Sequence, residues 1–203
     1  MYYRMIRLFI LFILLSIGLF ILRKKRFNPK FIRMSLGAAA CVLCALATIP
    51  VENLFVTFDS PIDAFHYRDS GDVQFIINGT DSTFVVASQN DVNKTTAIIP
   101  KSGQGWKIER DFSTETVNNF VADNNVIIVR HYKKTQDYYI EIGSSNAVEI
   151  WDSKGSEFVC DITSTEPVLQ SNGKNDYYTY YSYINNLNSE YELYIAGKLI
   201  TFD

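Results

Sequence analysis

Residues that commonly perform acid–base or nucleophilic chemistry are scarce in this chain of 203 residues, whose two histidines are His66 and His131. A catalytic triad or an imidazole metal site would have to use one of them, because imidazole titrates near neutral pH and readily binds metals. No serine or cysteine stands in the strand–turn–helix context of an activated nucleophile. We therefore expect both histidines to be structural. An envelope hydrolase that uses His66 or His131 is the third of three hypotheses for function.

The three cysteines predict neither a metal site nor a disulfide. Cys41 and Cys44 form a C-x-x-C pair within an apolar run, whereas redox and zinc sites need a polar, accessible setting. We interpret both as small apolar residues. Cys160 is the single cysteine after residue 50. The acidic turns at 69–72 and 152–155 lack the alternating oxygen ligands and distal glutamate of a calcium loop, so we expect no metal and no cofactor.

A cluster of tyrosines is the most unusual feature of the sequence. In a strand at 176–184, alternation places Tyr177, Tyr181 and Tyr183 on one face, and Tyr139 repeats the pattern in the preceding hairpin. If the other face packs into a core, these tyrosines form a strip that faces solvent and can bind sugars, peptides or lipid headgroups. The alternative is a strand packed on both sides, or a cross-strand aromatic ladder.

Charge divides the chain into two physically different parts. Residues 1–50 hold eight Lys or Arg and no acid, whereas residues 51–203 hold eleven Lys or Arg against all 22 acids, a net charge of −11. The acidic part argues against nucleic acid as a partner, because it would repel phosphates. The apolar first part argues against a plain cytosolic enzyme. We expect a membrane anchor at 1–50 and an extracytoplasmic domain at 51–203.

Two apolar runs in the first part predict a two-helix transmembrane hairpin, with helices at about 5–22 and 33–49. The loop at 23–33 between them is basic. The positive-inside rule places this loop in the cytoplasm and residues 51–203 outside a cell membrane, as a multi-pass protein in contact with the lipid bilayer. Its six charged residues are Arg23, Lys24, Lys25, Arg26, Lys30 and Arg33.

The second apolar run is rich in small residues, which allow helix backbones to approach closely in lipid. Gly37, Ala38, Cys41 and Ala45 lie near helical spacing, so this helix could pack against another membrane or envelope protein. A small-x-small sequence at 45–47 leaves open cleavage after Ala47, which would release residues 48–203. We favour the anchored form.

The acidic part predicts a mainly-β (α+β) antiparallel domain with one short N-terminal helix. Ser60 as N-cap, Pro61 at the first position and Asp63 three residues after the cap predict the helix, with Ile62, Phe65 and His66 on one face. Apolar and β-branched runs separated by turn residues predict successive hairpins, in a meander or sandwich. The segment at 112–120 is a short helix or a loop. The expected strands are 72–77, 83–88, 96–99, 106–108, 126–132, 138–142, 147–151, 157–162, 176–184, 190–195 and 198–202.

Two motifs carry a resemblance to a known family. Residues 58–67 read F-D-S-P-I-D-A-F-H-Y, and residues 100–108 read P-K-S-G-Q-G-W-K-I. They resemble an F-x-S-P-x-x-A-F-x-Y entry motif, followed by a turn-rich segment, in small, uncharacterised, membrane-anchored proteins of Gram-positive bacteria. The resemblance implies a bacterial envelope location and an outer α+β domain. It implies no catalytic residues, and His66 occupies a variable position of the motif.

These observations favour a membrane-tethered binding or interaction module whose ligand contacts the tyrosine strip. The alternative is an accessory subunit of a membrane complex that acts through its two helices. The hydrolase is the third hypothesis. The sequence specifies neither the ligand nor the oligomeric state.

Overall fold

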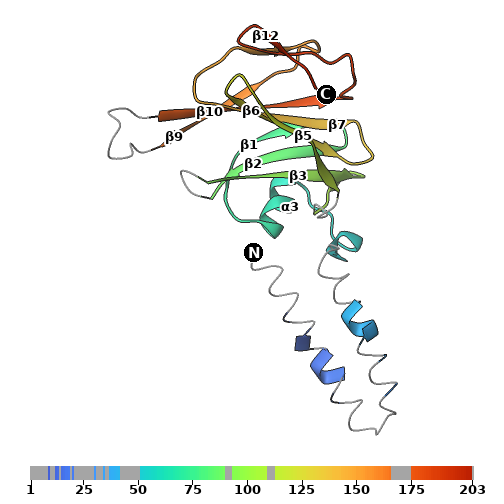
Figure 1. The fold of residues 1–203 in the computed structure, drawn as a ribbon. Coiled ribbons are helices and arrows are strands. Elements are labelled where there is room, and N and C mark those ends of the chain that lie inside the picture. The colour runs from blue at the N-terminus through green and yellow to red at the C-terminus, as the bar shows by residue number, and fades with distance from the viewer. Residues whose placement is uncertain are drawn as a thin grey trace.

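The computed structural model describes residues 9, 12, 13, 15–18, 20, 30, 34, 37–41, 51–89, 93–108, 113–165 and 175–202. From residue 51 on, the chain is mainly β, with antiparallel strands in three sheets (Figure 1). The predicted antiparallel β architecture is therefore confirmed.

The first sheet is a four-stranded meander in the order β1-β2-β3-β4. Its strands are β1 (Asp72–Asn78), β2 (Ser82–Ser88), β3 (Lys94–Ser102) and β4 (Gly105–Trp106). The turn predicted at 78–82 joins β1 to β2, which pair from Asn78 opposite Thr83 to Asp72 opposite Ser88, with a shift of register between Val73 and Phe75. Six of the seven residues of β2 are buried, because this sheet is covered on both faces.

The second sheet has five strands in the order β5-β6-β7-β10-β9. They are β5 (Thr114–Ala122), β6 (Asn125–Tyr132), β7 (Asp137–Ser144), β9 (Val159–Thr165) and β10 (Asn175–Asn185). The chain leaves this sheet after β7 and forms β8 (Ile150–Asp152) in a third sheet. That sheet is completed by β11 (Leu193–Ile195) and β12 (Lys198–Ile200), in the order β12-β11-β8.

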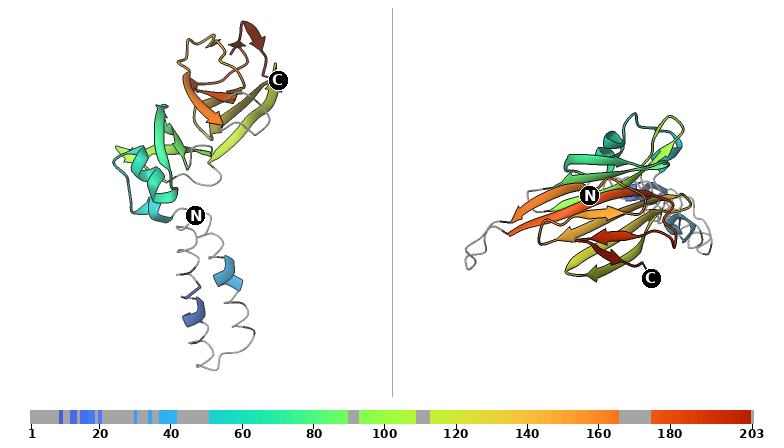
Figure 2. Two further views of the ribbon diagram at one scale, coloured as in Figure 1. Left: turned by 90° about the vertical axis from the view of Figure 1, so that its left-hand side faces the viewer. Right: turned by 90° about the horizontal axis from the view of Figure 1, so that it is seen from above.

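The sheets stack so that the second lies between the first and the third (Figures 1 and 2). Three apolar clusters fill the spaces between layers. One joins α3 (Pro61–Arg68) to the first sheet around Phe65 and Val85. The next lies between the first and second sheets around Phe84, Tyr139 and Tyr181. The largest joins the second and third sheets.

Helix α3 forms as predicted, after a short 3₁₀ turn η1 (Val51–Leu54). The backbone N–H of Asp63 donates to Ser60 Oγ at 3.1 Å, and Pro61 occupies the first turn. Ala64 and Phe65 are fully buried against the first sheet. His66, expected on the same face as Ile62 and Phe65, is exposed.

The predicted two-helix transmembrane hairpin, and the multi-pass localisation drawn from it, are wrong. In the portion of the chain that the structure describes, no helix is long and apolar enough to cross a membrane. A span needs about 20 consecutive apolar residues. The predicted contact with a lipid bilayer depended on that hairpin.

Several residues of the predicted anchor lie outside the described residues. These are Arg23, Lys24, Lys25, Arg26, Arg33 and Ala45, together with the cleavage site after Ala47. Lys30 is described and exposed. Gly37, Ala38 and Cys41 are helical and exposed, and a Cβ on Gly37 would meet no atom within 4 Å. Their packing against another protein stays a prediction.

Two local predictions are also corrected. The segment at 112–120, expected as a helix or loop, contributes most of β5, which pairs with β6 from Thr114 opposite Tyr132 to Ala122 opposite Asn125. The strands predicted on either side of the turn at 152–156 do not form a hairpin. β8 pairs with β11, and β9 pairs with β10.

Candidate functional site

A polar cavity opens between the first and second sheets, where β5 and β6 face β3 and the end of α3. Its volume is about 320 Å³. Phe84, Ala97 and Ile98 form its apolar wall, and all three are buried. We call this cavity the inter-sheet cleft. Its polar lining consists of Arg68, Thr96, Thr114, Glu115, Thr116 and Arg130.

Arg130 is the best-fixed side chain of the cleft. It lies on β6, on the face that meets the first sheet, and its side chain is 28% exposed. Its Nη1 donates to Thr96 Oγ1, its Nη2 lies 3.2 Å from Glu141 Oε2, and its guanidinium carbon lies 5.9 Å from the ring centre of Phe84. These contacts from both sheets fix the guanidinium at the cleft wall.

The carboxylate that pairs with Arg130 is only partly satisfied. Glu141 Oε2 is buried and accepts no hydrogen bond in the portion of the chain that the structure describes, although it lies within ion-pair distance of Arg130. A buried carboxylate oxygen without a donor is unfavourable, so this ion pair holds the guanidinium by charge more than by hydrogen-bond geometry.

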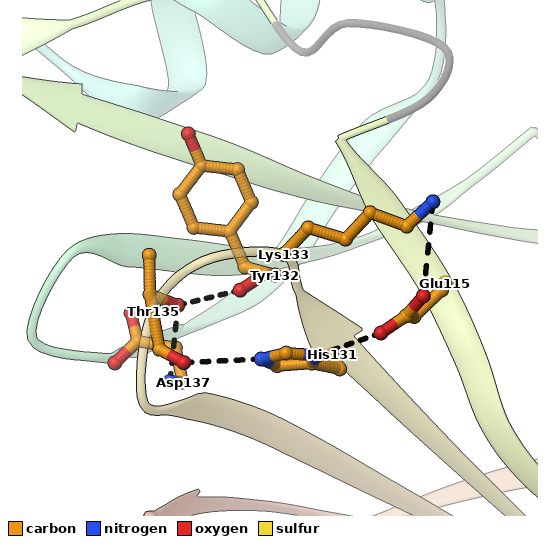
Figure 3. A network of polar contacts seen from close by, with 6 residues as sticks. All are labelled: Glu115, His131, Tyr132, Lys133, Thr135 and Asp137. Carbon is orange, nitrogen blue, oxygen red and sulfur yellow. Dashed lines mark hydrogen bonds and ion pairs between the residues drawn. The ribbon is translucent and has the colours of Figure 1, made fainter.

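A second charged residue, Glu115, lines the cleft and belongs to the polar network drawn in Figure 3. Glu115 on β5 accepts at 2.9 Å from His131 Nδ1, and its other carboxylate oxygen lies 3.7 Å from Lys133 Nζ. The hydrogen bond from His131 and the charge of Lys133 lower the pKa of the Glu115 carboxyl. Glu115 therefore keeps its negative charge, which the ammonium group of Lys133 partly offsets.

His131 does not have the geometry of a general base. Its Nδ1 faces Glu115, and its Nε2 lies 3.0 Å from the carbonyl oxygen of Thr135. Both ring nitrogens face acceptors, so both hydrogen bonds form together only when the ring is doubly protonated. The ring also stacks on Tyr138, with centroids 4.3 Å apart and planes 6° apart. His131 positions Glu115, and its second nitrogen is blocked by the backbone.

The predicted tyrosine strip is not on the surface. Tyr139 and Tyr181 are each 1% exposed, between the first and second sheets, and Tyr183 is partly buried beside them. Tyr177 alone of the four is exposed, at 40%. The structure therefore corrects the expectation of a solvent-facing strip. The alternative of a strand packed on both sides is confirmed, because Tyr180 lies in the cluster on the opposite face.

The hydroxyl of Tyr183 meets a buried carboxylate that the sequence analysis missed. Asp137 is fully buried and accepts from the backbone N–H of Asp81 at 2.8 Å, Ser82 Oγ at 2.7 Å and Tyr183 Oη at 2.9 Å. The N–H of Thr80 adds a fourth donor at 3.1 Å. This Asp137 cluster fastens the β1–β2 turn to the second sheet. The clue in the sequence was Asp81-Ser82 in a tight turn, whose donors need an acceptor.

The remaining chemically capable residues are dispersed. His66 is exposed on α3 and meets the edge of Phe65, with centroids 5.5 Å apart. Cys160 is exposed on β9. Within the described ranges, no group of three His, Cys, Asp or Glu side chains could hold a metal ion.

The sequence analysis did not identify the lining of the inter-sheet cleft. Arg130 alternates with buried apolar residues on β6, a pattern that is typical of a strand with one face in solvent. The first sheet covers that face, so the arginine lines a cavity instead.

No protein-family model matches the chain, and neither the curated proteins nor the solved structures contain a match to it. The resemblance to Gram-positive envelope proteins therefore stays a prediction.

Proposed function

We propose that the protein is a binding module and that its inter-sheet cleft takes a small organic anion, with the carboxylate of the ligand held by Arg130. The observation that carries this proposal is the position of that guanidinium, fixed by Thr96 and Glu141 at a cavity of about 320 Å³. Sites for small ligands have volumes of roughly 300–1,000 Å³.

The hydrogen-bond donors of the lining favour an anion. Arg68 and Arg130 bring two guanidiniums, which pair with Asp69 and Glu141, and the single carboxylate of the lining, Glu115, is paired with His131 and Lys133. A guanidinium binds a carboxylate through two parallel hydrogen bonds. The three threonine hydroxyls of the lining can donate as well.

The apolar part of the lining adds a contact that an organic ligand can use. Phe84 and Ile98 line the cavity beside the charged residues, and the guanidinium of Arg130 lies over the ring of Phe84. A ligand with a carboxylate at one end and a ring or short alkyl chain at the other would match both surfaces. The hydrolase hypothesis receives no such support, because the second nitrogen of His131 contacts a backbone carbonyl.

The proposal is tested by titrating the full chain with benzoate, using benzyl alcohol as the neutral counterpart, by calorimetry. We expect benzoate to bind and benzyl alcohol not to. Arg130→Gln should weaken benzoate binding about tenfold or more, because a charge-assisted pair is lost.

Two further variants control this test. Lys198→Gln removes a cation 66% exposed on β12, distant from the cleft, and should leave binding unchanged. Thr116→Val changes the lining without removing charge and should weaken binding less than Arg130→Gln. If benzoate fails to bind, or if Arg130→Gln binds benzoate as wild type while remaining folded by circular dichroism, the proposal is wrong.

A further inference from the structure

The third sheet carries a row of two aromatic side chains and one leucine on its outer face, which we call the aromatic row. Tyr194 on β11 is paired with Trp151 on β8 and with Leu199 on β12, so these three side chains stand side by side across the sheet. The neighbours Leu193, Ile195 and Ile200 are buried against the second sheet. Trp151 is 46% exposed and Leu199 49% exposed. Among the described elements, this sheet is the outermost layer on the side away from α3 (Figure 1).

The two rings of the row are stacked. The centroids of Trp151 and Tyr194 lie 3.8 Å apart, and their planes differ by 8°. Tyr194 therefore covers one face of the indole. The other face points toward the free side of β8, which is an edge strand of its sheet. An indole face binds a planar cation such as guanidinium more strongly than the other aromatic side chains do.

Carboxylates flank the ring pair at both ends. Glu149 precedes Trp151 by two residues on the same face of the strand, and the bond from the Ala196 N–H to the Glu149 carbonyl, at 2.9 Å, continues the ladder to that position. Glu192 precedes Tyr194 by two residues and accepts from its hydroxyl at 3.0 Å. The two strands are antiparallel, so the carboxylates lie at opposite ends, about 13 Å apart along the strand direction.

The residues around this face are also mainly acidic. Residues 147–160 and 186–202, which contain the third sheet, hold five acids and two lysines. Both lysines are engaged elsewhere. Lys154 Nζ donates to the carbonyl oxygen of Asn186 at 2.6 Å, and Lys198 pairs with Asp123 at 3.1 Å. An apolar aromatic row between carboxylates, in an acidic region, is complementary to a basic partner.

We propose that this outer face docks a basic polypeptide segment in extended conformation, with an arginine on the indole of Trp151 and flanking basic residues near Glu149 and Glu192. In an extended segment, residues two apart share a face at a spacing of about 7 Å. A segment with basic residues at alternate positions therefore places three cations over carboxylate, indole and carboxylate. This surface is separate from the inter-sheet cleft, and neither proposal depends on the other.

The test uses the full chain and a fluorescent heptapeptide that alternates glycine and arginine, read by fluorescence anisotropy. A matched peptide with citrulline in place of arginine has nearly the same shape without the charge. We expect the arginine peptide to bind, the citrulline peptide to bind at least ten times more weakly, and salt to weaken the arginine peptide.

Variants of the exposed surface localise the binding. Trp151→Ala should raise the Kd of the arginine peptide about tenfold, and Glu149→Gln should raise it by a smaller factor. Tyr177→Ala is the matched control, since it removes another exposed aromatic side chain, 40% exposed on the second sheet. It should leave the Kd unchanged.

Three results would overturn the proposal. One is equal affinity for the arginine and citrulline peptides. Another is wild-type affinity in Trp151→Ala, which would place any binding elsewhere. The third is binding of chitohexaose, lost in Trp151→Ala, without binding of the arginine peptide, which would make the face a carbohydrate platform.

Discussion

Raising the pH above 10 should unfold this protein through its buried tyrosines. Tyr139, Tyr181 and Tyr191 are at most 6% exposed. Burial raises the pKa of all three well above the ordinary value of 10.0, and the nearby carboxylate of Asp152 raises that of Tyr191 further. The folded protein therefore keeps these three protons at a pH where the unfolded chain releases them.

The sign and size of the effect follow from that difference. A raised pKa contributes stability that is complete below the pKa of the unfolded chain and is lost as the pH rises above it. Each tyrosine removes about 1.4 kcal/mol from the free energy of unfolding at about pH 11, and about 2 kcal/mol at about pH 11.5. Three such groups together lower the free energy of unfolding by about 4 kcal/mol at about pH 11 and by about 6 kcal/mol at about pH 11.5. Since domains are stable by about 5–15 kcal/mol, unfolding should follow near these pH values.

The assay is denaturant unfolding at a series of pH values, combined with near-ultraviolet absorbance of tyrosinate. Tyr181→Phe should reduce the loss at about pH 11 by about 1.4 kcal/mol, because one titrating group is gone. Tyr177→Phe, at an exposed position, should leave the loss unchanged. If all 13 tyrosines ionise near pH 10 while the protein stays folded, the burial argument is refuted and the tyrosine strip regains support.

Three further predictions concern the contacts between the sheets and the cleft rim. Gly79→Ala should destabilise the protein by about 1–3 kcal/mol in denaturant unfolding, because the new Cβ would lie 2.4 Å from Tyr139 Oη and 2.8 Å from Asp137 Oδ2; unchanged stability would contradict the close approach. Asp137→Asn should lower the free energy of unfolding by about 2–4 kcal/mol, since an amide cannot accept from all four donors, and a loss below about 0.5 kcal/mol would argue against the buried cluster. Glu115 should titrate below its ordinary pKa of 4.5 by carboxyl carbon NMR, and His131→Asn should move it back upward; the same titration in both proteins would refute the pair.

The local signals in the sequence predicted most elements after residue 50. Ser60 and Pro61 define the start of α3 through a side-chain acceptor and a fixed backbone angle, which need no distant partner. β6 is an alternating β-branched run and formed where expected. β5 was missed because its asparagines have low strand propensity, and its conformation comes from pairing with β6.

The sequence does not show which faces of a strand are covered by another sheet. The alternation in β10 correctly separates Tyr180 from Tyr181, but it does not reveal that a sheet lies against each face. For the same reason, the sequence does not show that the first sheet lies across the face of β6 that carries Arg130. The pairing of β8 was also beyond local signals, because its partner β11 comes after β9 and β10 in the chain.

The hydropathy of the first 50 residues led to the one prediction about the whole molecule that failed. An apolar run meets the composition criterion for a span, but a span also needs a continuous helix of sufficient length. In the described part of the chain, the structure contains no such helix. The apolar composition of a run therefore does not by itself predict a helix that spans a membrane.

The position of β10 between two apolar clusters has a consequence for folding. Tyr180 contributes to the cluster toward the third sheet, and Tyr181 to the cluster toward the first. Neither cluster is complete until residues 175–185 have been synthesised, although most of the other strands precede them. Such non-local closure slows folding and leaves nascent apolar faces uncovered for longer. The late strands β10, β11 and β12 thus control when the whole stack becomes stable on the ribosome, because the cluster toward the third sheet also contains Leu193, Ile195 and Ile200.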